Sequence, residues 1–227
     1  MGHEAYGKLR KGFQYLTLGA TSLLAEAILL LFKVPYLPSG QEVALGILAL
    51  LGTLLYFYAV FRPIGDGLAV LTAVDVGFAL SYVGVALALI GLAISVFVSL
   101  TFIFWAIPPF GEALLRSGLP TVFIELRVAF IGHIIALTGA VWLFASLAYK
   151  LGVRPVAFLY ILSLVLFIVG TIFLPRFVDI LEAAPLVVLT GGVLTYLLQL
   201  VGHVSMYLAL GKKLRDLPSE YSERRPA

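Results

Sequence analysis

Cysteine is absent from the sequence, and charged residues make up only 12% of its 227 residues. Without cysteine, the chain has no disulfide, no thiolate metal site, no cysteine nucleophile and no thioether-attached haem. Soluble domains carry about 25% charged residues, whereas 62% of this chain is hydrophobic. Because so few charges cannot cover a water-facing surface, we predict that most of the outer surface contacts lipid.

Familiar catalytic motifs are also missing. The sequence has no His-Glu-x-x-His, no Gly-x-Ser-x-Gly, no phosphate-binding loop and no aspartate-rich pair of the kind that holds Mg²⁺ at a lipid phosphate. Its cations gather at the ends of hydrophobic segments, where a membrane topology needs them, and this argues against nucleic-acid binding. We therefore expect no enzyme active site, no metal and no resident cofactor.

Six hydrophobic segments are each long enough to cross the hydrocarbon core, which needs about 20 helical residues. They cover residues 13–32, 43–61, 78–105, 122–149, 156–174 and 189–210. We predict an all-α, polytopic membrane bundle of about six transmembrane helices, with a single transmembrane domain over residues 1–214 and a polar cytoplasmic tail over 215–227. Small residues recur along the third span at Gly84, Ala88, Gly91 and Ser95, so we expect another helix to approach it closely.

The region between the second and third spans needs a special arrangement. The turn-like stretch Arg62-Pro-Ile-Gly-Asp-Gly67 is predicted to end the second span. The next 40 residues, 68–107, are mostly apolar, and as one helix they would be about 60 Å long, twice the hydrocarbon thickness. We predict that residues 68–76, which include Asp75, form an interfacial or re-entrant segment that ends in a bend at Gly77.

The positive charges predict the orientation of the chain. With six spans, the segments on the side of both termini hold eleven Lys and Arg residues, and those on the other side hold three. Cytoplasmic segments carry the excess of positive charge in membrane proteins. We predict a multi-pass protein of the cell membrane with both termini in the cytoplasm.

Charged residues inside the spans are the first candidates for function, because a charge at the bilayer centre costs about 2.5–3.5 kcal/mol on the mildest scale. Glu26 and Arg127 lie at similar depths near the outer ends of the first and fourth spans. We predict an ion pair between them, acting either as a buried strut that fixes helix packing or as a gate or proton site.

The last span carries a polar stripe formed by Tyr196, Gln199, His203 and Tyr207, which share one face of a helix. We expect this stripe to face the bundle interior and to line a path for a small solute or ion. If residues 68–76 enter the bilayer, Asp75 is expected to meet His203 in a carboxylate–imidazole proton relay. If they lie flat, Asp75 points at lipid headgroups.

A b-type haem is an alternative, with His133 and His203 as axial ligands, because each follows a glycine in an apolar span. Their depths argue against this alternative. His133 lies 17 residues before Lys150, and His203 lies nine before Lys212. The difference corresponds to about 12 Å along the membrane normal, whereas the two ligands of one upright haem need nearly equal depths.

Three stretches of the sequence carry a resemblance to a known family. They are Tyr6-Gly-Lys-Leu-Arg-Lys-Gly-Phe13, Arg62-Pro-Ile-Gly-Asp-Gly-Leu68, and the glycine-rich third span with Gly84 and Leu89-Ile-Gly-Leu92. Together they resemble an archaeal membrane-protein family known as domain of unknown function nine-seven-three. The resemblance implies an archaeal source and a multi-span fold, and it brings no catalytic residues.

Three functional classes are left open by the sequence. The first is a non-enzymatic membrane protein that moves a small solute or ion, or that serves as a membrane subunit of a larger complex. The second is the b-type cytochrome, and the third is a passive membrane scaffold. In each case the expected partners are the lipid bilayer and either a second copy of the chain or other membrane subunits.

Overall fold

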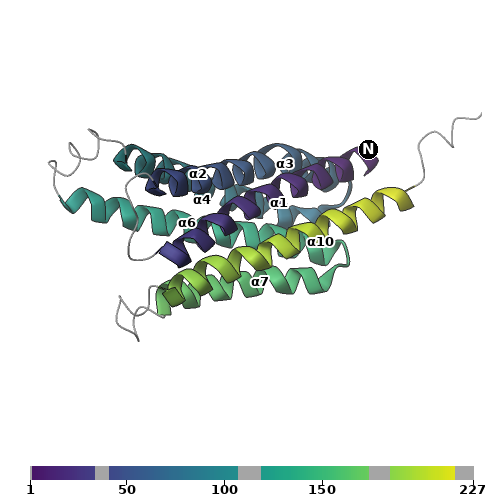
Figure 1. Ribbon diagram of the computed structural model, residues 1–227. Helices are drawn as coiled ribbons and strands as arrows, with labels where there is room; N and C mark the ends of the chain where they lie inside the picture. Colours follow the sequence, from purple (N-terminus) through teal and green to yellow (C-terminus); the bar gives the residue numbers. More distant parts are fainter. Residues whose placement is uncertain (1, 34–40, 107–118, 174–184, 218–227) are drawn as a thin grey trace, which may run out of the picture.

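The computed structural model of the chain describes residues 2–33, 41–106, 119–173 and 185–217, and every element in these ranges is helical (Figure 1). Side chains are described at these residues except 33, 41–43, 98–99, 101–106, 119–130 and 172–173. The elements are α1 (Gly2–Lys33), α2 (Gln41–Ala59), η1 (Val60–Ile64), α3 (Gly65–Val74), η2 (Val76–Phe78), α4 (Ala79–Ala106), α6 (Leu119–Lys150), α7 (Arg154–Ile168), η3 (Val169–Phe173), η4 (Val188–Leu194) and α10 (Thr195–Asp216).

Six of the described helical stretches are long and apolar enough to cross a membrane, which confirms the predicted all-α membrane bundle. They are Gly2–Phe32, Ala44–Val74, Val76–Phe97, Ile131–Lys150, Arg154–Thr171 and Pro185–Asp216. Large apolar side chains cover the outside of the bundle, with Leu80, Phe158 and Leu208 each more than 60% exposed. A water-soluble protein does not expose such a continuous apolar surface, so this surface contacts lipid.

The second helix continues through the stretch that was predicted to end it. Its α-helical part α2 passes into the π-helix η1, which contains Pro63, and then into α3 without a break. A proline inside an α-helix clashes with the carbonyl four residues earlier. Here the backbone N–H of Gly65 bonds the carbonyl of Val60, a five-residue step, and this wider turn accommodates the proline.

The predicted interfacial or re-entrant segment at 68–76 is therefore wrong. Residues 68–74 are the last two turns of the second long helix, and Leu68 and Leu71 on this segment are buried. The chain bends at Asp75, where the backbone is extended, rather than at Gly77. The Asp75 carboxylate accepts a hydrogen bond from the Gly77 N–H at 2.7 Å, and this starts the next helix.

Both ends of the described chain lie at the same end of the bundle (Figure 1). There α1 and α10 pack side by side, with an Arg10 Nη2 to Tyr207 Oη hydrogen bond of 2.9 Å and the Lys213 ammonium 5.3 Å from the centre of the Tyr6 ring. Helix α10 continues to Asp216, so the first two residues of the predicted tail are helical.

The close approach predicted for the third span is confirmed, and its partner is α6. A Cβ atom placed on Gly84 would collide with the backbone of Leu143, and one placed on Gly91 would collide with the backbone of Ala136. In the opposite direction, a Cβ on Gly139 would collide with Ala88. These glycines bring the two backbones into contact, which is how membrane helices gain packing energy without a hydrophobic driving force.

The Gly91→Ala variant tests this contact. Its new methyl group has no space against Ala136, so we expect a destabilisation of about 1–3 kcal/mol, seen as a lower apparent melting temperature in detergent. The matched control is Gly7→Ala, because a Cβ there meets nothing within 4 Å and alanine favours a helix by about 1 kcal/mol over glycine. Equal melting temperatures for the two variants would contradict the proposed packing.

Candidate solute path

His203 of α10 lies at the centre of the bundle with no exposed surface. Its Nδ1 is 2.9 Å from the Tyr160 hydroxyl of α7, and its Nε2 is 2.7 Å from the Tyr56 hydroxyl of α2. The Tyr56 hydroxyl in turn donates a 2.9 Å hydrogen bond to Oε1 of Gln199. Four buried polar side chains from three helices are therefore joined in one row.

The proton positions in this row follow from its hydrogen bonds. Tyr56 uses its only proton on Gln199, so its oxygen must accept a proton from Nε2 of His203. In a neutral imidazole Nδ1 is then an acceptor, and Tyr160 donates to it. Every polar atom named here is satisfied, and all the hydrogen bonds run in one direction from Tyr160 to Gln199.

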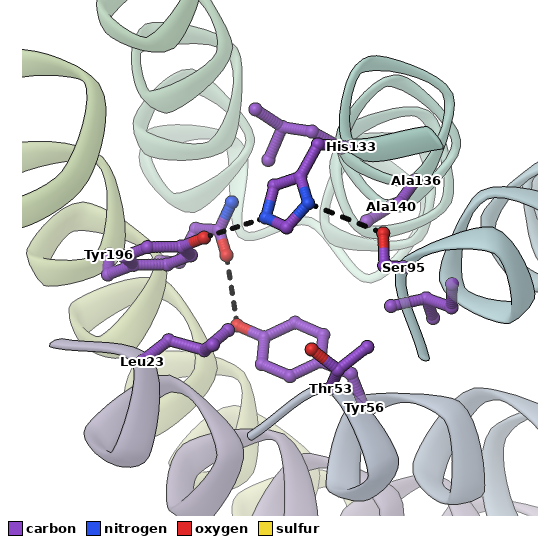
Figure 2. A pocket seen from close by; sticks show the side chains of 11 residues that line it. Leu23, Thr53, Tyr56, Ser95, His133, Ala136, Ala140 and Tyr196 are labelled. Carbon is purple, nitrogen blue, oxygen red and sulfur yellow. Dashed lines mark hydrogen bonds between the residues drawn. The ribbon is translucent and has the colours of Figure 1, made fainter. Parts of the chain in front are cut away.

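A second polar group surrounds His133 of α6. Its Nδ1 is 3.3 Å from the Ser95 hydroxyl of α4, and its Nε2 is 3.2 Å from the Tyr196 hydroxyl of α10. Figure 2 shows His133 between these two hydroxyls, with Tyr56 across the open space below. A cavity of about 40 Å³ lies between the two polar groups and is lined by residues of both, including Gln199 and His133.

A larger cavity of about 240 Å³ lies on the other side of His133 and Tyr196. Glu26 and Thr53 line it from α1 and α2, and Thr171 lines it from η3. Leu23, Thr53, His133 and Tyr196 line both cavities, so the two spaces adjoin. The hydrogen-bonded His133 and Tyr196 side chains stand between the cavity beside Glu26 and the one beside Gln199.

Two π-helical segments, η3 and η4, form one wall of the larger cavity. Thr171 of η3 and Gly191 and Gly192 of η4 line the cavity on this wall. The segments touch backbone to backbone, since a Cβ on Gly170 would lie 2.5 Å from the Gly191 nitrogen. Short π-helical turns inside α-helices are rare and frequently occur at functional sites. The backbone therefore departs from regular α-helix in the wall of the larger cavity.

The bundle is closed on the other side of His203, toward the termini. The His203 ring packs against Phe144 at 5.0 Å and Phe13 at 5.9 Å between centroids. Beyond them, Leu147, Met206 and Leu210 are completely buried. This layer, which we call the apolar plug (Phe13, Phe144, Leu147, Met206 and Leu210), separates the polar path from the end of the bundle that carries the termini.

The polar stripe of the last span is divided by the structure. Gln199 and His203 are buried, with 2% and 0% of their surface exposed, and Tyr196 lines both cavities. Tyr207 lies between Met206 and Leu210 of the apolar plug along α10, and its ring is 4.4 Å from the Arg10 guanidinium carbon. It contributes to the contact between α1 and α10 rather than to the cavities.

Asp75 does not meet His203, so the predicted proton relay between them is not formed. Because the second helix continues to Val74, it carries Asp75 to the end of the bundle, where the carboxylate lies 2.8 Å from the Lys150 ammonium and is half-exposed. The Lys150 ammonium and the Gly77 N–H hold the pKa of this carboxyl below its usual range. Asp75 thus ties the bend before α4 to the end of α6.

The predicted ion pair between Glu26 and Arg127 involves a side chain outside the described residues, because none is described at Arg127. Glu26 itself is half-buried and lines the larger cavity.

The geometry around the histidines does not fit a bis-histidine haem. Both nitrogens of His203 are held by tyrosine hydroxyls, and aromatic rings pack around the imidazole. An iron ligand would have to give up one of these hydrogen bonds and clear space for a macrocycle. His133 and His203 belong instead to two separate polar groups with the small cavity between them.

Tyr56 and Tyr160, the two partners of His203, were not predicted from the sequence. Tyrosine is common at membrane interfaces, so its presence alone did not mark a site. A signal was nevertheless present, because Thr53 and Tyr56 are three residues apart and share one face of an otherwise apolar helix.

The Tyr56→Phe variant tests the row of buried hydrogen bonds. It leaves Nε2 of His203 and Oε1 of Gln199 without their partner, so we expect a destabilisation of about 1–3 kcal/mol. The control is Tyr58→Phe on the same helix, where the side chain is 46% exposed and the change is expected to stay within about 0.5 kcal/mol. Comparable melting temperatures for both variants would show that the row does not stabilise the fold.

Searches of protein-family models, of curated proteins and of solved structures find no match to this chain. The resemblance to the archaeal family named above stays a prediction.

Proposed function

We propose that this protein is a membrane transporter that moves a small solute or ion through the two adjoining cavities. The observation that carries the proposal is a hollow, polar centre that an apolar plug closes toward the termini, with no such plug among the described side chains on the Glu26 side. Protein interiors are normally close-packed, and a passive scaffold has no need of a cavity lined by a carboxylate, hydroxyls and an imidazole. Ligand sites between helices of a bundle have this composition.

The path begins near Glu26 and reaches Gln199 by way of Tyr196 and His133. Beyond Gln199, the hydrogen-bonded His203 and the apolar plug close it. An open channel needs a continuous wet path, which this state lacks. A transporter of the alternating-access kind needs a site that is closed toward one side at a time, and the arrangement of cavities and plug fits that requirement.

The proposed location is the cell membrane, with both termini in the cytoplasm. The end of the bundle that carries the termini also carries Arg10, Lys150 and Lys213, and positive charge marks the cytoplasmic side of membrane proteins. In this orientation the Glu26 cavity lies toward the outer side and the apolar plug toward the cytoplasm.

Reporter fusions test the orientation. Green fluorescent protein fused after Ala227 is expected to fluoresce when the fusion is expressed in bacteria, while alkaline phosphatase at the same place is expected to be inactive, because the first reporter folds in the cytoplasm and the second folds outside it. The opposite pattern would reverse the assignment of the two sides.

Single cysteines test the solute path, and the absence of natural cysteine means that no background residue reacts. In membrane vesicles, Thr53→Cys is expected to react with a small, charged thiosulfonate added from the outer side, because Thr53 lines both cavities. The matched control on the same helix is Ala59→Cys, which is completely buried and is not among the lining residues of either cavity, so we expect it to be protected from that side.

Labelling from the cytoplasmic side separates a transporter from a one-sided binding protein. A transporter must expose Thr53→Cys to that side in a second conformation, so we expect slower but complete labelling there. Protection of Thr53→Cys from both sides would contradict a solute path. Reaction from the outer side alone, under all conditions, would contradict transport.

A further inference from the structure

We infer that the larger cavity is a binding site for a small organic cation with an alkylammonium group, and that Glu26 is its counter-ion. This inference rests on the proposed function and deepens it, because it names the class of solute. Four properties of the cavity carry it: its carboxylate, the acceptor oxygens of its two threonines, its apolar and aromatic lining, and its size.

Glu26 is the acidic group among the described lining residues of this cavity. No hydrogen bond or ion pair joins its carboxylate to another side chain among the residues that the structure describes. A carboxylate surrounded by apolar side chains loses hydration without compensation. A cation bound in the cavity would supply that compensation.

The two threonine hydroxyls of the lining face the cavity as acceptors. Thr53 donates its proton to the carbonyl of Ala49 at 2.8 Å, and Thr171 donates to the carbonyl of Phe167 at 2.6 Å. Each hydroxyl has one proton to donate, so only lone pairs remain for a ligand. An ammonium group has donors and no acceptor, which complements these oxygens and the carboxylate, whereas an anion would be repelled by all three.

The rest of the lining favours an organic cation over a metal ion. Most of the wall is apolar, formed by residues such as Leu23, Leu30 and Val188, whereas Ca²⁺ needs six to eight oxygen ligands and Mg²⁺ six. Phe167 and Tyr196 add aromatic rings, which attract ammonium groups. The volume of about 240 Å³ leaves space for an alkyl chain beside the charged group.

The test compares three probes of similar size and different charge: n-butylammonium, n-butanol and butyrate. Binding to the purified full-length protein is measured by calorimetry and by the rise in apparent melting temperature with ligand concentration. We expect n-butylammonium to bind and both n-butanol and butyrate to bind at least about tenfold more weakly, since they lack the charge that pairs with Glu26. Equal binding of the alcohol and the amine, or preferred binding of butyrate, would overturn the inference.

The variant Glu26→Gln keeps the shape of the side chain and removes its charge. We expect it to weaken n-butylammonium binding at least about tenfold, as truncating a desolvated charge pair does. The matched control is Glu4→Gln on the same helix, where the carboxylate is exposed and paired with Lys8, and it should bind like the unaltered chain. Unchanged binding by Glu26→Gln would overturn the role of Glu26.

A second variant tests the same site if Glu26→Gln does not fold. Thr53→Val removes one acceptor with little change of shape and should weaken the amine more than the alcohol, and an equal effect on both probes would overturn the role of the acceptor oxygens. Transport and amine binding are tested independently. If Thr53→Cys is labelled from both sides but the amine does not bind, transport is supported and the amine site is contradicted.

If the amine binds but Thr53→Cys is labelled from one side only, the amine site is supported and transport is contradicted.

Discussion

Polar side chains in the closely packed part of this bundle must find hydrogen-bond partners within the protein, and this constraint shapes the structure around them. His203 is completely buried and receives a hydrogen-bond partner on each ring nitrogen, from Tyr56 and Tyr160. An unsatisfied buried polar group costs about 1–3 kcal/mol, so the helices that carry these partners are held in one relative arrangement. The same row of bonds then separates the hollow half of the bundle from the apolar plug.

Much of the fold follows from the sequence because the bilayer imposes simple rules on it. Six apolar segments of sufficient length predict six helices, and the glycine and alanine spacing in the third span predicts the contact with α6 that Gly84 and Gly91 make. The continuation through Pro63 does not follow from composition. Proline normally ends a helix, and only the five-residue hydrogen-bonding step at Gly65 allows this helix to continue and to carry Asp75 to Lys150.

The candidate site was predictable only in part, for a related reason. Periodicity within one helix places Gln199 and His203 on the inward face. It does not say which other helices supply partners, since Tyr160 is 43 residues from His203 and Tyr56 is 147 residues from it. Nor does it reveal the hollow beside Glu26, because that space depends on the π-helical backbones of η3 and η4.

The buried polar groups around His203 and those around Glu26 differ in how fully their hydrogen-bonding capacity is used within the protein. In the row from Tyr160 to Gln199, the named donors and acceptors are used within the protein, which makes it a rigid base for the path. Around Glu26 the balance is different, because the hydroxyl protons of Thr53 and Thr171 are bonded to backbone carbonyls while their lone pairs remain available. A cavity with surplus acceptors selects for a ligand with donors and positive charge. Such a ligand would therefore complete the hydrogen bonding in the Glu26 cavity, as Tyr56 and Tyr160 complete it around His203, and it would do so without disturbing the apolar plug.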